Sequence, residues 1–314
     1  MRLVLLALLL LACDARADDK IKTTVDADSC VDDGKPYDQA VLKARIEYLA
    51  SDELGGRVPG TDGDKLARAH IVARMKCLGL TVTEQPFKDA KKKDTANVIG
   101  VLKGTDEKVG SEIVIVGAHH DHEGNGHLGA NDNASGVTGL LAIAQAMAQK
   151  DAKPKRTIVF IAFGAEEEGD LGSAFYASHV PDDLPIDKVV QFINLDMIGS
   201  YKSKSIVAAM GSFAKFPARK ALDKLVKTYP KTKFALGGHG YRSDHEAFCQ
   251  KGIPYVFFWT PDARCYHEKC DKPAAIDLLH MADIASLGGD LTWDLANSDV
   301  DLLASRTKLG CGQK

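Results

Sequence analysis

Residues 113–122 read IVIVGAHHDH, a short apolar run that ends directly in imidazole and carboxylate side chains. The run is rich in Val and Ile and shows little alternation, which is typical of a strand covered on both faces. Similar runs occur at Asn97–Leu102, Thr157–Phe163, Val189–Leu195 and Tyr255–Trp259. We therefore expect buried strands at these four places and at Ile113–Ala118.

Helical patterns lie between and around these runs. The segment after Asn133 should be a helix with its apolar stripe on the sheet, because apolar residues recur there at helical spacing: Val137, Leu140, Leu141, Ala144 and Met147. Further helices are expected at Asp38–Leu49, Leu66–Leu78 and Ala274–Leu295. Strands alternating with helices predict an α/β fold, a three-layer α/β/α sandwich around a mixed, mostly parallel sheet.

Polar residues follow four of the five predicted strands, where parallel sheets bind their ligands. These residues are His119 to His122, Glu166 to Glu168, Asp196, and Tyr266 with His267. The loop GANDNASG (129–136) adds Asp132 beside the same edge. Carboxylates mixed with imidazoles suit zinc or another borderline divalent ion, and the surplus of carboxylates suggests two ions that share a bridging ligand.

Composition excludes some classes of function. The 314 residues are 45% hydrophobic and 26% charged, which is an ordinary globular composition that can bury a core. The net charge of −3 argues against a general nucleic-acid or anionic-membrane binder, because such proteins need a clear positive excess.

The N-terminus resembles a secretory signal peptide. Residues 1–12 read MRLVLLALLLLA, an apolar run shorter than the roughly 20 residues that a membrane-spanning helix requires. An A-x-A site at Ala15–Ala17 would release Asp18, whereas Leu10–Cys13 resembles a lipobox that would make Cys13 a lipidated N-terminal residue. We favour residues 1–17 as a signal peptide and a secreted or periplasmic protein, with membrane attachment only if Cys13 is lipidated.

Cysteine usage is compatible with an oxidising compartment. Without Cys13, the even set of six is Cys30, Cys77, Cys249, Cys265, Cys270 and Cys311. Disulfides are plausible but spacing does not choose their pairing. Cys30 with Cys311 would join the two termini, a bridge near Cys265 or Cys270 would brace the loop there, and free buried thiols are the alternative.

Six strings, in this order, resemble the motifs of the co-catalytic zinc exopeptidases, which include bacterial leucyl aminopeptidases, glutamate carboxypeptidases and glutaminyl cyclases. They are GAHHDH (117–122), GANDNASG (129–136), AFGAEEEGDLGS (162–173), NLDMIG (194–199), GYRSDHEAF (240–248) and CYHEKCD (265–271). Residues 49–80 are also similar to the entry helices of the family's aminopeptidases. The short spacing from Leu80 to His119 leaves no room for the protease-associated domain of larger members, so residues 18–314 are expected to form a single catalytic domain.

The resemblance implies a role for each matched residue. Asp132 would bridge two Zn²⁺ ions, with His119 and Asp196 completing one site and Glu167 and His267 the other. Glu166 would be the general base, which takes a proton from the attacking water and delivers one to the leaving amine. Tyr266 would help to stabilise the tetrahedral oxyanion.

Two further carboxylates and several histidines lie in or near the same motifs. Asp121 matches the carboxylate that fixes the imidazole tautomer of His119, and Asp271 is expected to do the same for His267. His120, His122 and His127 stay outside the predicted ligand set, since a His-rich loop either recruits an extra ion or is simply solvated. Asp244 and His245 either shape the pocket wall or cap a helix that begins there.

The leading hypothesis is a secreted two-zinc aminopeptidase that acts on peptides. Asp170 and Glu168 depart from the family pattern and would shift the preference toward a basic or small residue. Rival hypotheses are a carboxypeptidase or dipeptidase of the same family, a glutaminyl cyclase, which works with a single zinc, and a catalytically silent binding module. Neither the polarity of cleavage nor the oligomeric state follows from the sequence.

Overall fold

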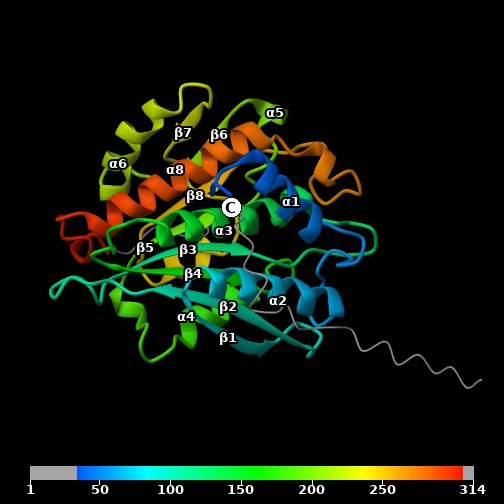
Figure 1. The fold of residues 1–314 in the computed structure, drawn as a ribbon, viewed down its shortest axis with the longest axis horizontal. Helices are drawn as coiled ribbons and strands as arrows, with labels where there is room; N and C mark the ends of the chain where they lie inside the picture. The colour runs from blue at the N-terminus through cyan, green and yellow to red at the C-terminus, as the bar shows by residue number, and fades with distance from the viewer. Residues whose placement is uncertain (1–33, 307–314) are drawn as a thin grey trace, which may run out of the picture.

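The computed structural model describes residues 34–306, which fold around one mixed sheet of eight strands (Figure 1). Across the sheet the strands run in the order β1-β2-β4-β3-β5-β8-β6-β7. Their bounds are Thr81–Lys88 (β1), Asp94–Leu102 (β2), Ile113–His119 (β3), Thr157–Phe163 (β4), Val189–Leu195 (β5), Val207–Met210 (β6), Phe234–Leu236 (β7) and Tyr255–Trp259 (β8).

The four central strands, β4, β3, β5 and β8, are parallel to one another. On either side the direction reverses, because β2 pairs antiparallel with β4 and β6 pairs antiparallel with β8. Every residue of β3, β4 and β5 is buried, as their mostly apolar runs with little alternation predict. The expected three-layer α/β class and mixed sheet are confirmed.

The strands that the sequence does not predict lie at the two edges. β1 is mostly exposed and contains Pro86, so it lacks a buried apolar run. β6 and β7 have four and three residues, which is too short for a recognisable period. All five predicted strands exist, and only β2 begins earlier than expected, at Asp94.

Helices cover both faces of the sheet. Their bounds are Gln39–Leu49 (α1), Asp62–Cys77 (α2), Gly136–Ala148 (α3), Leu171–Ser178 (α4), Tyr201–Lys204 (α5), Pro217–Leu225 (α6), His245–Gln250 (α7) and Leu278–Asn297 (α8). One core contains side chains from α1, α2, α3, α6 and α8, and the other contains side chains from α4 and α7. Alternate residues of β3 enter the two cores, Val114 and Val116 on one side and Ile113 and Ile115 on the other.

Helix boundaries follow local capping. Asp38 accepts a hydrogen bond from the backbone N–H of Ala40, so α1 starts one residue after the predicted position. Thr61 caps α2, which therefore begins earlier than Leu66. The last helix begins at Leu278 rather than at Ala274, because a separate short turn at Pro273–Ala275 precedes it.

Within the described part of the chain, no helix combines the length and the apolar character needed to cross a bilayer. The predicted signal peptide and lipobox lie outside the described residues, as does the suggested pairing of Cys30 with Cys311.

Candidate active site

A cavity of ≈ 310 Å³ opens at the carboxyl ends of the parallel strands β3, β4, β5 and β8. Seven of the nine predicted site residues line it: His119, Asp132, Glu166, Glu167, Asp196, Tyr266 and His267. They come from loops that are far apart in the sequence and meet here because the four strands are parallel. The antiparallel strand β2 points the other way and contributes no lining residue.

Asp132 stands between the two predicted ligand histidines. Its Oδ1 lies 3.3 Å from Nε2 of His119, and its Oδ2 lies 3.2 Å from Nε2 of His267. Each histidine faces one further carboxylate. Asp196 Oδ1 is 3.4 Å from His119 Nε2, and Glu167 Oε2 is 3.2 Å from His267 Nε2. The result is two sets of three donors that share one carboxylate.

This donor set fits a pair of zinc ions. Zinc bonds to nitrogen and oxygen are about 2.0–2.1 Å long, so neighbouring ligand atoms of a tetrahedral site stand roughly 3.3 Å apart. The distances from Nε2 of each histidine to its two carboxylates, 3.2 to 3.4 Å, are of this size. Two histidines with three carboxylates are also a chemically suitable donor set for zinc.

The charges around the two histidines also indicate a site that binds cations. Burial alone would lower the pKa of His119, but Glu166, Asp196, Asp121 and Asp132 raise it well above the ordinary value. Hydrogen bonds to Asp132 and Glu167 raise the pKa of His267 to about 10. Without metal, protons on these two rings supply the positive charge that the buried carboxylates require.

Asp121 supports both sides of the site. Nδ1 of His119 lies 3.3 Å from the backbone oxygen and 3.7 Å from the carboxylate of Asp121, which leaves Nε2 directed at the cavity. The same carboxylate accepts hydrogen bonds from the backbone N–H groups of Glu166 (3.0 Å) and Glu167 (3.2 Å). Asp121 therefore positions the loop after β4, in addition to the imidazole of His119 that it was predicted to orient.

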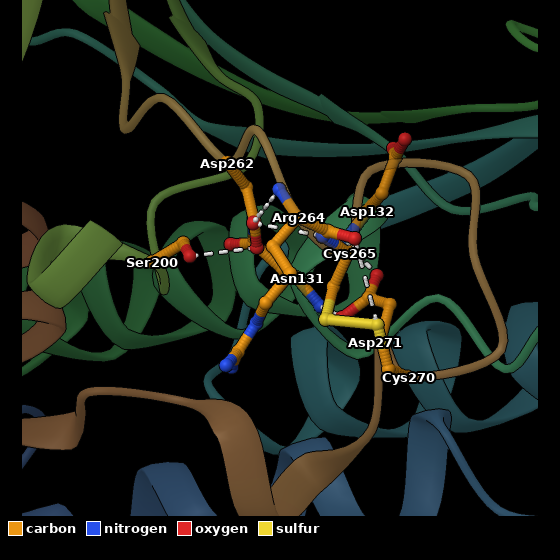
Figure 2. The surroundings of a disulfide bond; sticks show 8 residues. All are labelled: Asn131, Asp132, Ser200, Asp262, Arg264, Cys265, Cys270 and Asp271. Carbon is orange, nitrogen blue, oxygen red and sulfur yellow. Dashed lines mark hydrogen bonds between the residues drawn. A yellow bond between two sulfur atoms is a disulfide. The ribbon is translucent and has the colours of Figure 1, made fainter. Parts of the chain in front are cut away.

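Asp271 has a different partner from the one expected. Its carboxylate accepts hydrogen bonds from the backbone N–H groups of Asn131 (2.7 Å) and Asp132 (3.0 Å), and Figure 2 shows it beneath this turn. Nδ1 of His267 instead lies 3.2 Å from Oε1 of Glu123. The prediction that Asp271 orients His267 is wrong, because the turn at residue 131 comes closer to Asp271 than the imidazole does.

Asparagines on either side of Asp132 join its loop to the end of β5. Asn133 accepts hydrogen bonds from the backbone N–H groups of Gly136 and Met197. Asn131 accepts one from the backbone N–H of Gly199. These bonds hold Asp132 in register with the loop that begins at Asp196.

Two buried residues that were not predicted from the sequence, Ser243 and Arg57, also position the site. Ser243 donates a hydrogen bond of 2.8 Å to Oδ2 of Asp196, so the serine of the SDH motif, rather than its Asp or His, contacts a predicted ligand. Asp244 makes no side-chain cap to α7, and His245 packs against the rings of Tyr255 and Phe257.

Arg57 is the second missed residue. It is fully buried and donates hydrogen bonds to the backbone oxygens of Leu49, His120, Leu128 and Gly129. The guanidinium thereby holds both ends of the loop between His119 and Asp132. The signal in the sequence is an isolated cation within the glycine-rich string LGGRVPG (54–60).

Glu166 is almost enclosed, and its Oε2 lies 3.9 Å from Nε2 of His119. Burial raises the pKa of this carboxyl well above its ordinary value, His119 lowers it, and the neighbouring Asp196, Asp244 and Glu167 raise it further. A raised pKa is suitable for a group that accepts and then returns a proton.

Tyr266 and His267 lie within a small covalent ring. Cys265 and Cys270, five residues apart, form a disulfide (Figure 2). Both site residues lie between them in the sequence. The two site rings are in contact, with a centroid distance of 3.9 Å and an interplanar angle of 35°. This disulfide confirms a bridge in the predicted loop. Cys77 and Cys249 each take part in a disulfide as well.

The histidines left out of the ligand set differ in their surroundings. His120 is buried and lies 2.9 Å from Asp64, away from the cavity. His122 is also buried, and its Nδ1 is 2.7 Å from Oε1 of Glu167. His127 lies next to Glu123, which faces His267.

The two anions that depart from the family pattern are paired with groups of the protein. Asp170 forms an ion pair with Arg242, and Glu168 accepts a hydrogen bond from the backbone N–H of Ala90 and faces Lys91. Arg242, not Asp170 or Glu168, lines the cavity. The two carboxylates therefore do not supply the negative pocket expected for a basic substrate residue.

Comparison with known proteins identifies the family. Residues 97–290 match the model of peptidase family M28. The chain belongs to peptidase family M28. This M28 chain is 31% identical over 237 residues to aminopeptidase YwaD of Bacillus subtilis (strain 168), covering 72% of this chain and 50% of that protein. It is 27% identical over 254 residues to leupeptin-inactivating enzyme 1 of Streptomyces exfoliatus, covering 73% and 55%.

The M28 chain thus spans about half the length of these curated relatives. Among solved structures, a zinc aminopeptidase from Bacillus subtilis superposes with a TM-score of 0.74 at 18% identity, over 86% of this chain and 98% of that one. At this identity the superposition demonstrates the shared fold.

Proposed function

We propose that this M28 chain is a two-zinc aminopeptidase. The observation that carries the proposal is Asp132, whose two carboxylate oxygens face His119 and His267 separately, at 3.3 and 3.2 Å. A carboxylate in this position is able to bridge two cations. The names of the similar aminopeptidases support the direction of cleavage.

His119, Asp132 and Asp196 would hold one ion, and Asp132, Glu167 and His267 the other. When bound, a pair of zinc ions supplies Lewis acidity that activates water and polarises the scissile carbonyl. The hydrogen bonds that Asp121 and Asp271 accept from the backbone, and the one that Ser243 donates to Asp196, keep these metal donors at ligand spacing before any ion arrives.

Glu166 is the proton carrier of the proposed reaction. It accepts a proton from the water that attacks the peptide carbonyl, and it delivers a proton to the nitrogen as the C–N bond breaks. The products are a free amino acid and a peptide shortened at its N-terminus. Asp121 positions this carboxylate through the backbone of residues 166 and 167.

Tyr266, which lines the cavity, would donate a hydrogen bond to the oxygen that gains charge in the tetrahedral intermediate. Partial burial and the nearby carboxylates raise the pKa of Tyr266 to about 12. The phenol therefore keeps its proton at neutral pH and remains a donor.

The cavity walls support a preference for an apolar N-terminal side chain. Phe257, Trp259, Met197 and Pro261 line the cavity next to the predicted ligands. A peptide substrate would place its terminal side chain against these residues.

Residues 1–17 are proposed to be a signal peptide, and residues 18–314 a single catalytic domain that acts outside the cytoplasm. The Cys265–Cys270 disulfide supports this location, because structural disulfides persist in oxidising compartments.

The test uses three peptides of one apolar sequence, one free at both ends, one N-acetylated and one C-amidated, with zinc-loaded protein and with chelator. We expect mass spectrometry to show N-terminal shortening that acetylation blocks and chelation abolishes. Cleavage that requires a free C-terminus would replace the aminopeptidase with a carboxypeptidase. No cleavage of any of the three, together with cyclisation of a fourth peptide that begins with glutamine, would indicate a glutaminyl cyclase.

A further inference from the structure

A second group of possible metal ligands lies in the loop after β3. His122, Glu123 and His127 each offer a ligand atom, and these atoms lie within 4.8 Å of one another. None of the three belongs to the five proposed zinc ligands. The backbone explains the proximity: Gly124, Asn125 and Gly126 all have positive φ, and the turn that they form returns His127 beside Glu123.

His122 has one nitrogen available for an ion. Its side chain is fully buried, and Nδ1 lies 2.7 Å from Oε1 of Glu167. Nε2 is enclosed and has no hydrogen-bond partner among the described residues. An imidazole that donates through Nδ1 to a carboxylate has an unprotonated Nε2, the arrangement found in histidines that bind zinc.

Glu123 and His127 supply the other donors. Nδ1 of His127 is buried without a hydrogen-bond partner in the described chain and stands 3.3 Å from Oε2 of Glu123. This separation equals the roughly 3.3 Å edge of a tetrahedral zinc site. Two imidazoles and one carboxylate are a common set of three protein ligands for zinc, with a fourth position open.

We propose that His122, Glu123 and His127 form a third divalent-cation site, separate from the catalytic pair and selective for zinc-like ions. Glu123 would connect the two centres, because its Oε1 lies 3.2 Å from Nδ1 of the ligand His267 while its Oε2 faces His127. Glu167 connects them as well, through one oxygen toward His122 and the other toward His267.

The test is zinc content at equilibrium. Untagged full-length wild type, His127→Gln, Glu123→Gln and His179→Gln are dialysed against the same buffered free Zn²⁺, and zinc is measured per chain by mass spectrometry of the elements. His127 is partly exposed and outside the proposed catalytic machinery, and exposed His179 is the matched control. We expect one zinc fewer in His127→Gln and in Glu123→Gln, and no change in His179→Gln.

For His127→Gln the expected difference of one zinc does not depend on how fully the catalytic pair is occupied, because His127 faces Glu123 and none of the five proposed ligands. This variant therefore separates the third site from the proposed function, whereas Glu123 also contacts the ligand His267. Equal zinc contents in wild type and His127→Gln would overturn the third site. A loss of the same size in His179→Gln would also overturn it, because surface histidines would then account for the extra ion. Circular dichroism of the metal-free variants verifies that each is folded.

Discussion

The carboxylate of Asp271 holds the backbone of Asp132, accepting a hydrogen bond of 3.0 Å from its N–H and one of 2.7 Å from the N–H of Asn131. Two backbone donors on one buried carboxylate fix the direction of the turn that presents Asp132 to both histidines. The residue next to the Cys265–Cys270 disulfide thus determines where the bridging ligand lies (Figure 2).

Replacing Asp271 tests this relationship. Asp271→Ala removes both hydrogen bonds and leaves two buried N–H groups unpaired, so zinc affinity should fall about 10- to 100-fold, as is usual when a residue that supports a ligand is lost. Competition with a chromophoric chelator measures it. Exposed Asp52→Asn is the control, and an unchanged affinity in Asp271→Ala would contradict the assignment.

Glu166 can be neutralised without a change of shape. Glu166→Gln should keep zinc, because Glu166 is outside both donor sets, and lose turnover by about 10²- to 10⁴-fold, because the amide cannot carry the proton. Steady-state kinetics on an aminoacyl anilide and zinc analysis of the same sample measure the two effects. Full activity of Glu166→Gln would rule out the proposed mechanism.

Tyr266 is half exposed, so its substitution should leave the fold intact. Tyr266→Phe removes only the hydroxyl and should lower kcat about 10²- to 10³-fold with little change in KM, since the hydrogen bond forms in the transition state. Tyr241→Phe, which also lines the cavity and is exposed, is the matched control. Equal losses in the two variants would argue against a specific role of Tyr266.

The disulfide loop can be opened without touching the site residues. The double variant Cys265→Ala, Cys270→Ala should lose about 2 kcal/mol of unfolding free energy, the value expected for a short closed loop. It should also bind zinc more weakly, because His267 would no longer be held inside a closed ring. Chemical denaturation and zinc titration test the two expectations. An unchanged zinc affinity would show that the disulfide does not help to position His267.

Buried His245 predicts a loss of stability in acid. Burial lowers its pKa to about 3, whereas the unfolded chain has the ordinary value near 6.5. The unfolded state therefore binds a proton first, and stability falls as the pH drops below about 6.5. Between pH 7.5 and 5.0 this amounts to roughly 2 kcal/mol. His245→Gln should lose that much less than wild type in denaturation at both pH values, whereas His179→Gln should behave like wild type.

The central strands and the approximate position of the site were predictable because both depend on local pattern. β4, β5 and β8 have the predicted bounds, since each is a short and mostly apolar run. The edge strands β1 and β7 and the neighbouring β6 were missed, because exposed or very short strands carry little hydrophobic signal.

The supporting residues were less predictable than the lining residues. Arg57 and Ser243 act through hydrogen bonds to groups 8 to 72 positions away. The residues next to Arg57 and Ser243 in the sequence do not indicate which groups these two side chains contact. The partner predicted for Asp271 was wrong for the same reason. Asp271 is close to His267 in the sequence, but its carboxylate binds the backbone of Asn131, which is distant in the sequence.

The sequence by itself determined the α/β class and seven of the residues that line the cavity, because buried strands and the polar residues that follow them are short contiguous stretches of sequence. Only the tertiary structure decided that Asp132 divides its two oxygens between His119 and His267. It also decided that Asp271, Ser243 and Arg57 hold the ligand loops. Such contacts depend on distances of a few tenths of an ångström between distant segments, and packing of the whole chain sets those distances.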